Sequence, residues 1–225
     1  FVRDMLERNT VGSDCPPKVG AITGDNVRFV RASWELRPSS FASIELNDVD
    51  SAPDRLPWGR FLKGGARRIW LDPVDEVVKW RHSGLETKML AELRYGSHSR
   101  QIRNEALYFQ PGVAFTMIGS DFSARLHRWR CIVDGTATSV FSSSARLPYY
   151  TCLLNSSGAK RVLEAFNPTI HFEIGDVVRL PLYSIDRPEE ILALVRSEFT
   201  RGERGRETSI EYLQPGPSPW RCTQE

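Results

Sequence analysis

Two short basic stretches hold the residue types best suited to chemistry in this chain. The first, LKGGARR (62–68), combines two glycines with three cations, and the second is ARLHRWRC (124–131). In an extended strand, Arg128 and Arg130 of the second stretch share one face and Trp129 lies on the other. Guanidinium groups bind phosphate and guanine bidentately, and glycines let a backbone approach a nucleic-acid strand. Both stretches favour nucleic-acid recognition; the alternative is an exposed strand that carries charge for solubility.

Motifs for catalysis and metal binding are missing from the sequence. There is no glycine-rich dinucleotide or phosphate loop and no Gly-x-Ser-x-Gly turn. Asp72, Asp75 and Glu76 with Lys79 match a metal-dependent nuclease poorly, because Glu-x-x-Lys spacing puts the last two on opposite faces of a strand. The histidines and cysteines lack ligand spacing, so we predict no metal site and no catalytic residue. These residues are His82, His98, His127, His171, Cys15, Cys131, Cys152 and Cys222.

Positive charge is concentrated in the middle of the chain. Residues 55–161 hold 17 Lys/Arg and 8 Asp/Glu, a net charge of +9, although the whole chain has a net charge of only +2. A basic centre of this kind is typical of proteins that bind polyanions, with a solvated basic face as the alternative.

The rest of the composition is that of an ordinary globular protein. No apolar run approaches the roughly 20 residues that cross a membrane, so we expect a cytoplasmic protein with no membrane contact. The chain begins at Phe1 instead of Met, which favours a piece of a longer protein.

Alternating apolar residues predict strands in the first half of the chain. We expect strands at 18–22 and 27–36 joined by a turn at Thr23–Asn26, and further strands at 40–47 and 75–80. Residues 85–96 have a helical pattern that Gly96 ends.

Strands also dominate residues 107–141, where Pro111-Gly112 and Asp134-Gly135 mark turns. From Pro148 the pattern becomes helical, with two short helices broken near 156–158. A strand and a Gly-Asp turn follow at 169–176, then a helix at 187–199 and a charged, loosely ordered tail from Arg201. We therefore predict an α+β fold that is mixed and strand-rich, with short helices gathered in the C-terminal third.

Four segments in a fixed order resemble one protein family over residues 18–182. The opening matches Gly-x-x-Thr-Gly-x-Asn-x-x-Phe, a Lys-Gly-Gly run precedes the strand at Val77–Trp80, and the closing run has Asn-Pro-Thr, Gly-Asp and Leu-Pro in turn. The family is the C-terminal target-recognition region of adenine-specific DNA methyltransferases of the BREX and phage-growth-limitation type, to which Type IIG restriction–modification enzymes are related. The motif residues are Gly20, Thr23, Gly24, Asn26, Phe29, Lys63, Gly64, Gly65, Asn167, Pro168, Thr169, Gly175, Asp176, Leu180 and Pro181.

The resemblance implies a module that reads double-stranded DNA and presents its adenine to a separate catalytic domain. That domain would bind S-adenosylmethionine and carry an Asn/Asp-Pro-Pro-Tyr/Phe motif, whereas the Pro16-Pro17 pair of this chain lies in DCPPK. We therefore expect no cofactor in this chain and an upstream methyltransferase domain of the same protein as its partner, with other defence-system proteins as further candidates. Two segments depart from the family pattern: ARRIWLDP is more basic, and LQPGPSPWRC has no counterpart.

Domain boundaries follow from the resemblance: a lead-in at 1–17, the target-recognition domain at 18–183, and a C-terminal helix with a loose tail at 184–225. We expect Arg28 and Arg31 to contact the DNA backbone, and base-reading residues to lie on loops within 55–145. The DNA-binding candidates are Arg28, Arg31, Lys63, Arg67, Arg68, Arg81, His82, Arg103, Arg125, Arg128 and Arg130. The alternative function is a protein–protein interaction module of a defence complex.

Overall fold

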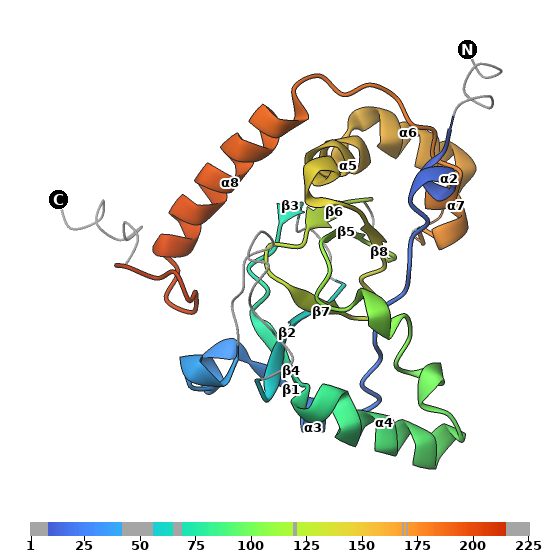
Figure 1. Ribbon diagram of the computed structural model, residues 1–225. Helices are drawn as coiled ribbons and strands as arrows, with labels where there is room; N and C mark the ends of the chain where they lie inside the picture. The colour runs from blue at the N-terminus through green and yellow to red at the C-terminus, as the bar shows by residue number, and fades with distance from the viewer. Residues whose placement is uncertain are drawn as a thin grey trace.

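Two small β-sheets with short strands form the centre of the structure, a computed structural model that describes residues 9–41, 56–64, 69–118, 121–167, 169 and 171–214 (Figure 1). The first sheet has the strand order β1-β4-β2-β7, and the second has the order β3-β6-β5-β8. Parallel pairing joins β2 to β7 and β3 to β6, and the other neighbouring strands are antiparallel. The bounds are β1 Val30–Ala32, β2 Trp58–Leu62, β3 Trp70–Leu71, β4 Glu76–Lys79, β5 Gly112–Phe115, β6 Ala124–Leu126, β7 Cys131–Val133 and β8 Ser139–Phe141.

Helices lie at both ends of this pair of sheets (Figure 1). The α-helices are α2 Val11–Asp14, α3 Asn26–Phe29, α4 Arg81–Tyr95, α5 Leu147–Asn155, α6 Ser157–Phe166, α7 Ile174–Val178 and α8 Pro188–Arg204. Short 3-10 turns are η1 Ser33–Glu35, η2 Pro38–Ser40, η4 His98–Arg100, η5 Glu105–Leu107 and η6 Ser144–Arg146. The predicted α+β class is confirmed.

Three apolar clusters hold the layers together. The largest packs α5 and α6 against the second sheet, with Tyr150 and Leu163 fully buried. Another packs α4 and its neighbours on the first sheet around Phe29 and Trp80. The third contains Trp129 and residues of both sheets, and it therefore joins them. Burying large apolar side chains in this way is the main source of folding free energy.

Several helices occur where the sequence predicts them. Gly96 ends α4 in the left-handed conformation, with a φ of 68°. Ser156 separates α5 from α6, and its side chain accepts a hydrogen bond from the amide of Ala159. Pro188 occupies the first turn of α8, and this helix continues to Arg204, beyond Arg201 where the tail was predicted to start. A proline has no amide hydrogen to lose at this position.

The predicted strand pair at 18–22 and 27–36 is wrong. Asp25 caps a helical turn by accepting the amide hydrogen of Arg28, so residues 26–29 form α3 and only Val30–Ala32 remain a strand. A capping carboxylate offers the backbone a local partner that competes with sheet pairing. Residues 18–22 make only isolated bridges, at Lys18 and Ala21.

Two more turns differ from the prediction, and one strand is partly outside the described residues. Gly175 and Asp176 lie inside α7 instead of in a strand-linking turn, because the Asp176 carboxylate accepts the amide hydrogen of Glu173 and starts a helix. Residues 105–107 form a 3-10 turn, so the strand after it begins only at Gly112. Of the strand predicted at 40–47, residues 42–47 lie outside the described ranges.

Candidate nucleic-acid interface

A groove along the edge strand β1 brings two of the predicted DNA-binding residues together. Arg31 comes from β1 itself and Lys63 from the end of β2. The Arg31 guanidinium donates to the carbonyl oxygens of Val27 and Val30 at 2.6 and 2.7 Å. Lys63 Nζ lies 2.9 Å from Glu76 Oε1 in a partly exposed pair. The groove is lined by Asn26, Val27, Val30, Arg31, Ala32, Glu35, Leu36, Lys63 and Glu76.

A second groove lies at the start of α4 and includes the predicted residues Arg81 and His82, both exposed. Its other lining residues are Lys79, Gly84, Leu85, Glu86 and Met89. His82 has a φ of 52°, within a non-helical stretch that also contains Ser83 and Gly84. A side chain on Gly84 would come within 2.5 Å of the Trp80 ring, so this close turn requires glycine.

Arg28 connects the two grooves. Its guanidinium donates to Glu86 Oε1 at 2.5 and 3.0 Å, and Lys79 Nζ lies 2.5 Å from the other oxygen of the same carboxylate. Hydrogen bonds from Lys79 and then Arg28 lower the pKa of Glu86. We call five cations of the two grooves and their link, together with the His82 side chain, the α3–α4 surface: Arg28, Arg31, Lys63, Lys79, Arg81 and His82. Exposed ion pairs of this kind are weak, so a phosphate can replace the carboxylate partner.

The structure places Arg103 outside these grooves. It is exposed after η4, and its guanidinium donates to the carbonyl oxygen of Arg100 at 3.1 Å. Arg67 and Arg68 lie outside the described residues, as do Gly65 and Pro168 of the family motifs.

Arg125 is buried, with its side chain only 1% exposed. Its guanidinium donates to Asp72 Oδ2 at 3.2 Å and to the carbonyl oxygen of Lys63 at 3.1 Å. A buried cation needs such partners, because removing an ion from water costs on the order of several kcal/mol. We therefore leave Arg125 out of the α3–α4 surface and assign it to the packing between the sheets.

Arg128 and Arg130 lie in the loop between β6 and β7, so the predicted single strand with opposite faces is wrong there. The Arg128 guanidinium lies over the Trp129 ring, 4.8 Å from its centroid, and pairs with Glu211. Arg130 is half-buried.

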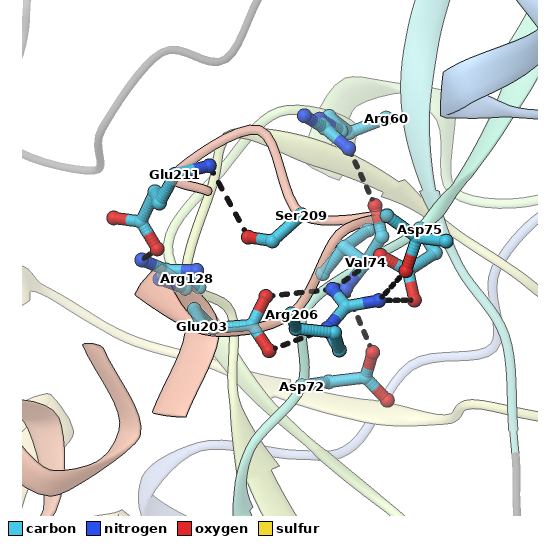
Figure 2. Close-up of polar contacts among 10 residues, drawn as sticks. Arg60, Asp72, Val74, Asp75, Arg128, Glu203, Arg206, Ser209 and Glu211 are labelled. Atoms are coloured by element: carbon cyan, nitrogen blue, oxygen red, sulfur yellow. Dashed lines mark hydrogen bonds and ion pairs between the residues drawn. The ribbon is translucent and has the colours of Figure 1, made fainter. Parts of the chain in front are cut away.

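An ion network near Arg128 joins segments that are far apart in the sequence (Figure 2). Arg206 donates to Asp75 at 2.7 and 2.9 Å and to Glu203 at 2.6 and 2.8 Å. Those hydrogen bonds, above all the ones to Glu203, raise the pKa of Arg206.

Arg60 is buried next to this network and donates to the carbonyl oxygen of Val74 at 2.7 Å. Burial lowers its pKa to about 10. Sequence reasoning missed Arg60, Asp75, Glu203 and Arg206 as a group, since no local pattern connects residues over such separations.

Two motif glycines lie where the backbone of another segment comes close. A side chain on Gly20 would come within 1.8 Å of the Val133 carbonyl oxygen, and one on Gly64 within 2.2 Å of that of Thr136. Phe29, another residue of these motifs, is fully buried. The two glycine positions therefore leave no room for a larger side chain.

The opening turn is built from the other motif residues of that segment. The Thr23 hydroxyl donates to Asn26 Oδ1, and Gly24 has a φ of 69°. This left-handed conformation favours glycine.

The closing motif is a small polar cluster. Asn167 donates to Asp176 Oδ2 at 3.1 Å and to the His171 carbonyl oxygen at 3.0 Å. Burial on its own raises the pKa of Asp176, but hydrogen bonds from Asn167 and Arg179 outweigh this effect and lower it. By contrast, Gly175 has open space around its Cα.

Parallel pairing among the described strands is confined to β2–β7 and β3–β6. In the described ranges, no group of three His, Cys, Asp or Glu side chains is placed to hold a metal ion. None of the described helices is long and apolar enough to span a membrane.

The fold is an α+β module with two grooves, in which the cations of the α3–α4 surface lie beside Glu35, Glu76 and Glu86. No family model matches the chain. Over 174 residues it is 27% identical to the adenine-specific methyltransferase PglX of Lacticaseibacillus casei (strain Zhang). The alignment covers 76% of this chain and 14% of that relative, so the chain is related to a small part of a methyltransferase.

Proposed function

We propose that this chain is the DNA-sequence-recognition module of an adenine-specific (N6) DNA methyltransferase from a phage-defence or restriction–modification system. The similarity to PglX over 76% of the chain carries the proposal. Because the match covers only 14% of the relative, a separate domain has ample room to bind S-adenosylmethionine and transfer the methyl group. This chain would position the adenine for that domain.

The α3–α4 surface supplies the contacts in this proposal. Arg28 and Lys79 share the Glu86 carboxylate, so a phosphate that replaces it gains two cations at once. In the β1 groove, Arg31 would contact the DNA backbone and Lys63 would contact a base edge. An arginine–guanine pair discriminates between bases by about 1–3 kcal/mol.

Selection from a pool of random duplexes at two salt concentrations tests the proposal. We expect retained duplexes to be enriched in one short adenine-containing motif and binding to weaken steeply as salt rises. Salt-sensitive binding without enrichment would contradict sequence reading by this chain alone. A lack of binding even at low salt would contradict the DNA-recognition function altogether.

A protein-interaction module is the second candidate, and the exposed side of α4 favours it. Leu85, Met89 and Leu93 follow one another at four-residue spacing and are 52, 56 and 84% exposed. An apolar stripe of this kind is typical of a protein contact. Replacing Leu93, which does not line the second groove, with serine would weaken partner capture in that case.

A further inference from the structure

Glu211 occupies an anion site that the structure builds around Arg128. The Arg128 guanidinium contacts two aromatic rings and lies 4.8 Å from the centroid of Trp129 and 5.1 Å from that of Phe199. Its side chain is 13% exposed and pairs with the Glu211 carboxylate. Stacking fixes the plane of the guanidinium, and carboxylate and phosphate oxygens accept the same pair of hydrogen bonds. The site is therefore suited to either anion.

The segment that carries Glu211, residues 205–214, is held mainly by polar contacts. Arg206 anchors it to Asp75, and the amides of Leu213 and Gln214 donate to the Arg204 carbonyl oxygen at 2.9 and 3.3 Å. Its apolar side chains contribute little, since Ile210 is 45% and Leu213 is 71% exposed. Contacts between charges weaken with ionic strength and in the presence of a competing polyanion.

Glu211 supplies the carboxylate that pairs with Arg128. Among the other described residues nearby, Arg206 pairs with Asp75 and Glu203, and Arg125 pairs with Asp72. Figure 2 shows Glu211 at the outer side of this group, with its amide donating to the Ser209 hydroxyl oxygen at 3.2 Å. Withdrawing Glu211 therefore removes the carboxylate that pairs with the Arg128 guanidinium.

We propose that Glu211 is an internal substitute for a DNA phosphate. DNA displaces it from Arg128, and residues 205–214 lower the affinity for DNA until they are displaced. This inference rests on the proposed DNA-binding function. It adds a regulated phosphate contact that lies apart from the α3–α4 surface.

Charge-neutral variants of the full chain test the inference. Glu211→Gln keeps an oxygen that accepts from Arg128 but removes the competing charge, and Glu207→Gln removes the same charge from an exposed position of the same segment. Dissociation constants for a duplex pool are measured at two salt concentrations. We expect Glu211→Gln to bind at least about threefold tighter than Glu207→Gln at low salt, which is the scale of one partly exposed ion pair. Adding Arg128→Gln should remove the gain.

One control and two possible outcomes complete the test. Urea unfolding confirms that each variant is folded. Equal affinities for Glu211→Gln and Glu207→Gln, with the wild-type chain still binding DNA, would overturn the substitution by Glu211 and leave the proposed function intact. Absence of DNA binding by every protein, the wild-type chain included, would overturn both.

Discussion

Arg206 and Asp75 are 131 residues apart in the sequence, yet two guanidinium nitrogens of Arg206 donate to both carboxylate oxygens of Asp75. The same guanidinium also binds Glu203 on the last turn of α8. The pair therefore fixes the C-terminal helix to the loop that precedes β4 (Figure 2).

Replacing Arg206 with alanine is expected to lower the free energy of unfolding by about 2 kcal/mol, because two largely buried carboxylates lose their partner. Urea unfolding followed by circular dichroism measures the loss. Arg201→Ala is the matched control, since its pair with Glu198 is exposed and should contribute less than about 1 kcal/mol. Equal losses of unfolding free energy in the two variants would show that the Arg206–Asp75 contact stabilises the fold no more than an exposed ion pair does.

Stability is expected to fall between about pH 6.5 and pH 4 because of His127. Its ring is fully buried, and burial lowers the pKa of His127 from 6.5 to about 4. A base whose pKa is depressed in the folded state favours folding only while neutral, so its contribution is complete above pH 6.5 and is lost as the pH falls. The loss amounts to about 3 kcal/mol at most.

Urea unfolding at pH 7 and pH 4.5 measures this effect in the wild-type chain and in His127→Gln. The variant is less stable overall, because Gln110 and Ser139 lose their ring partner. Its stability should change less between the two pH values. If the free energy of unfolding of His127→Gln falls between these two pH values as much as that of the wild-type chain, other groups cause the acid sensitivity.

Gly20→Ala is expected to destabilise the chain by about 2 kcal/mol or more, since the added methyl group collides with the backbone of Val133 on β7. Gly202→Ala is the control: this α8 position has open space, and alanine favours helix over glycine by about 1 kcal/mol. Thermal unfolding should move in opposite directions for the two variants. A shift of the same sign in both would contradict the close approach at Gly20.

Arg81→Gln is expected to weaken DNA binding for all sequences and to reduce the dependence of log K on log salt by about 1. Arg161→Gln removes the same charge from exposed α6, at the opposite end of the molecule from α4, and should leave affinity nearly unchanged (Figure 1). Fluorescence anisotropy over a range of salt concentrations gives both values. Equal losses of affinity in Arg81→Gln and Arg161→Gln would show that net charge controls binding and that the α3–α4 surface has no special role.

Local signals made parts of the fold predictable. Gly96 and Pro188 mark the end of α4 and the start of α8, because a left-handed residue and a proline act on their own turn of helix. The strands predicted at 18–22 and 27–36 are wrong because a local helix signal lies inside the alternating pattern. Asp25 caps a helical turn within a pattern that alternates like a strand.

The sequence by itself determined the mixed class, the main helices and the concentration of positive charge in its middle. Only the tertiary structure decided what each cation does. It gathers Arg31 and Lys63 in one groove, buries Arg125 against Asp72, and covers Arg128 with Glu211 from 83 residues downstream. These arginines look alike along the chain, because solvent exposure and ion pairing depend on distances in space that sequence spacing does not encode.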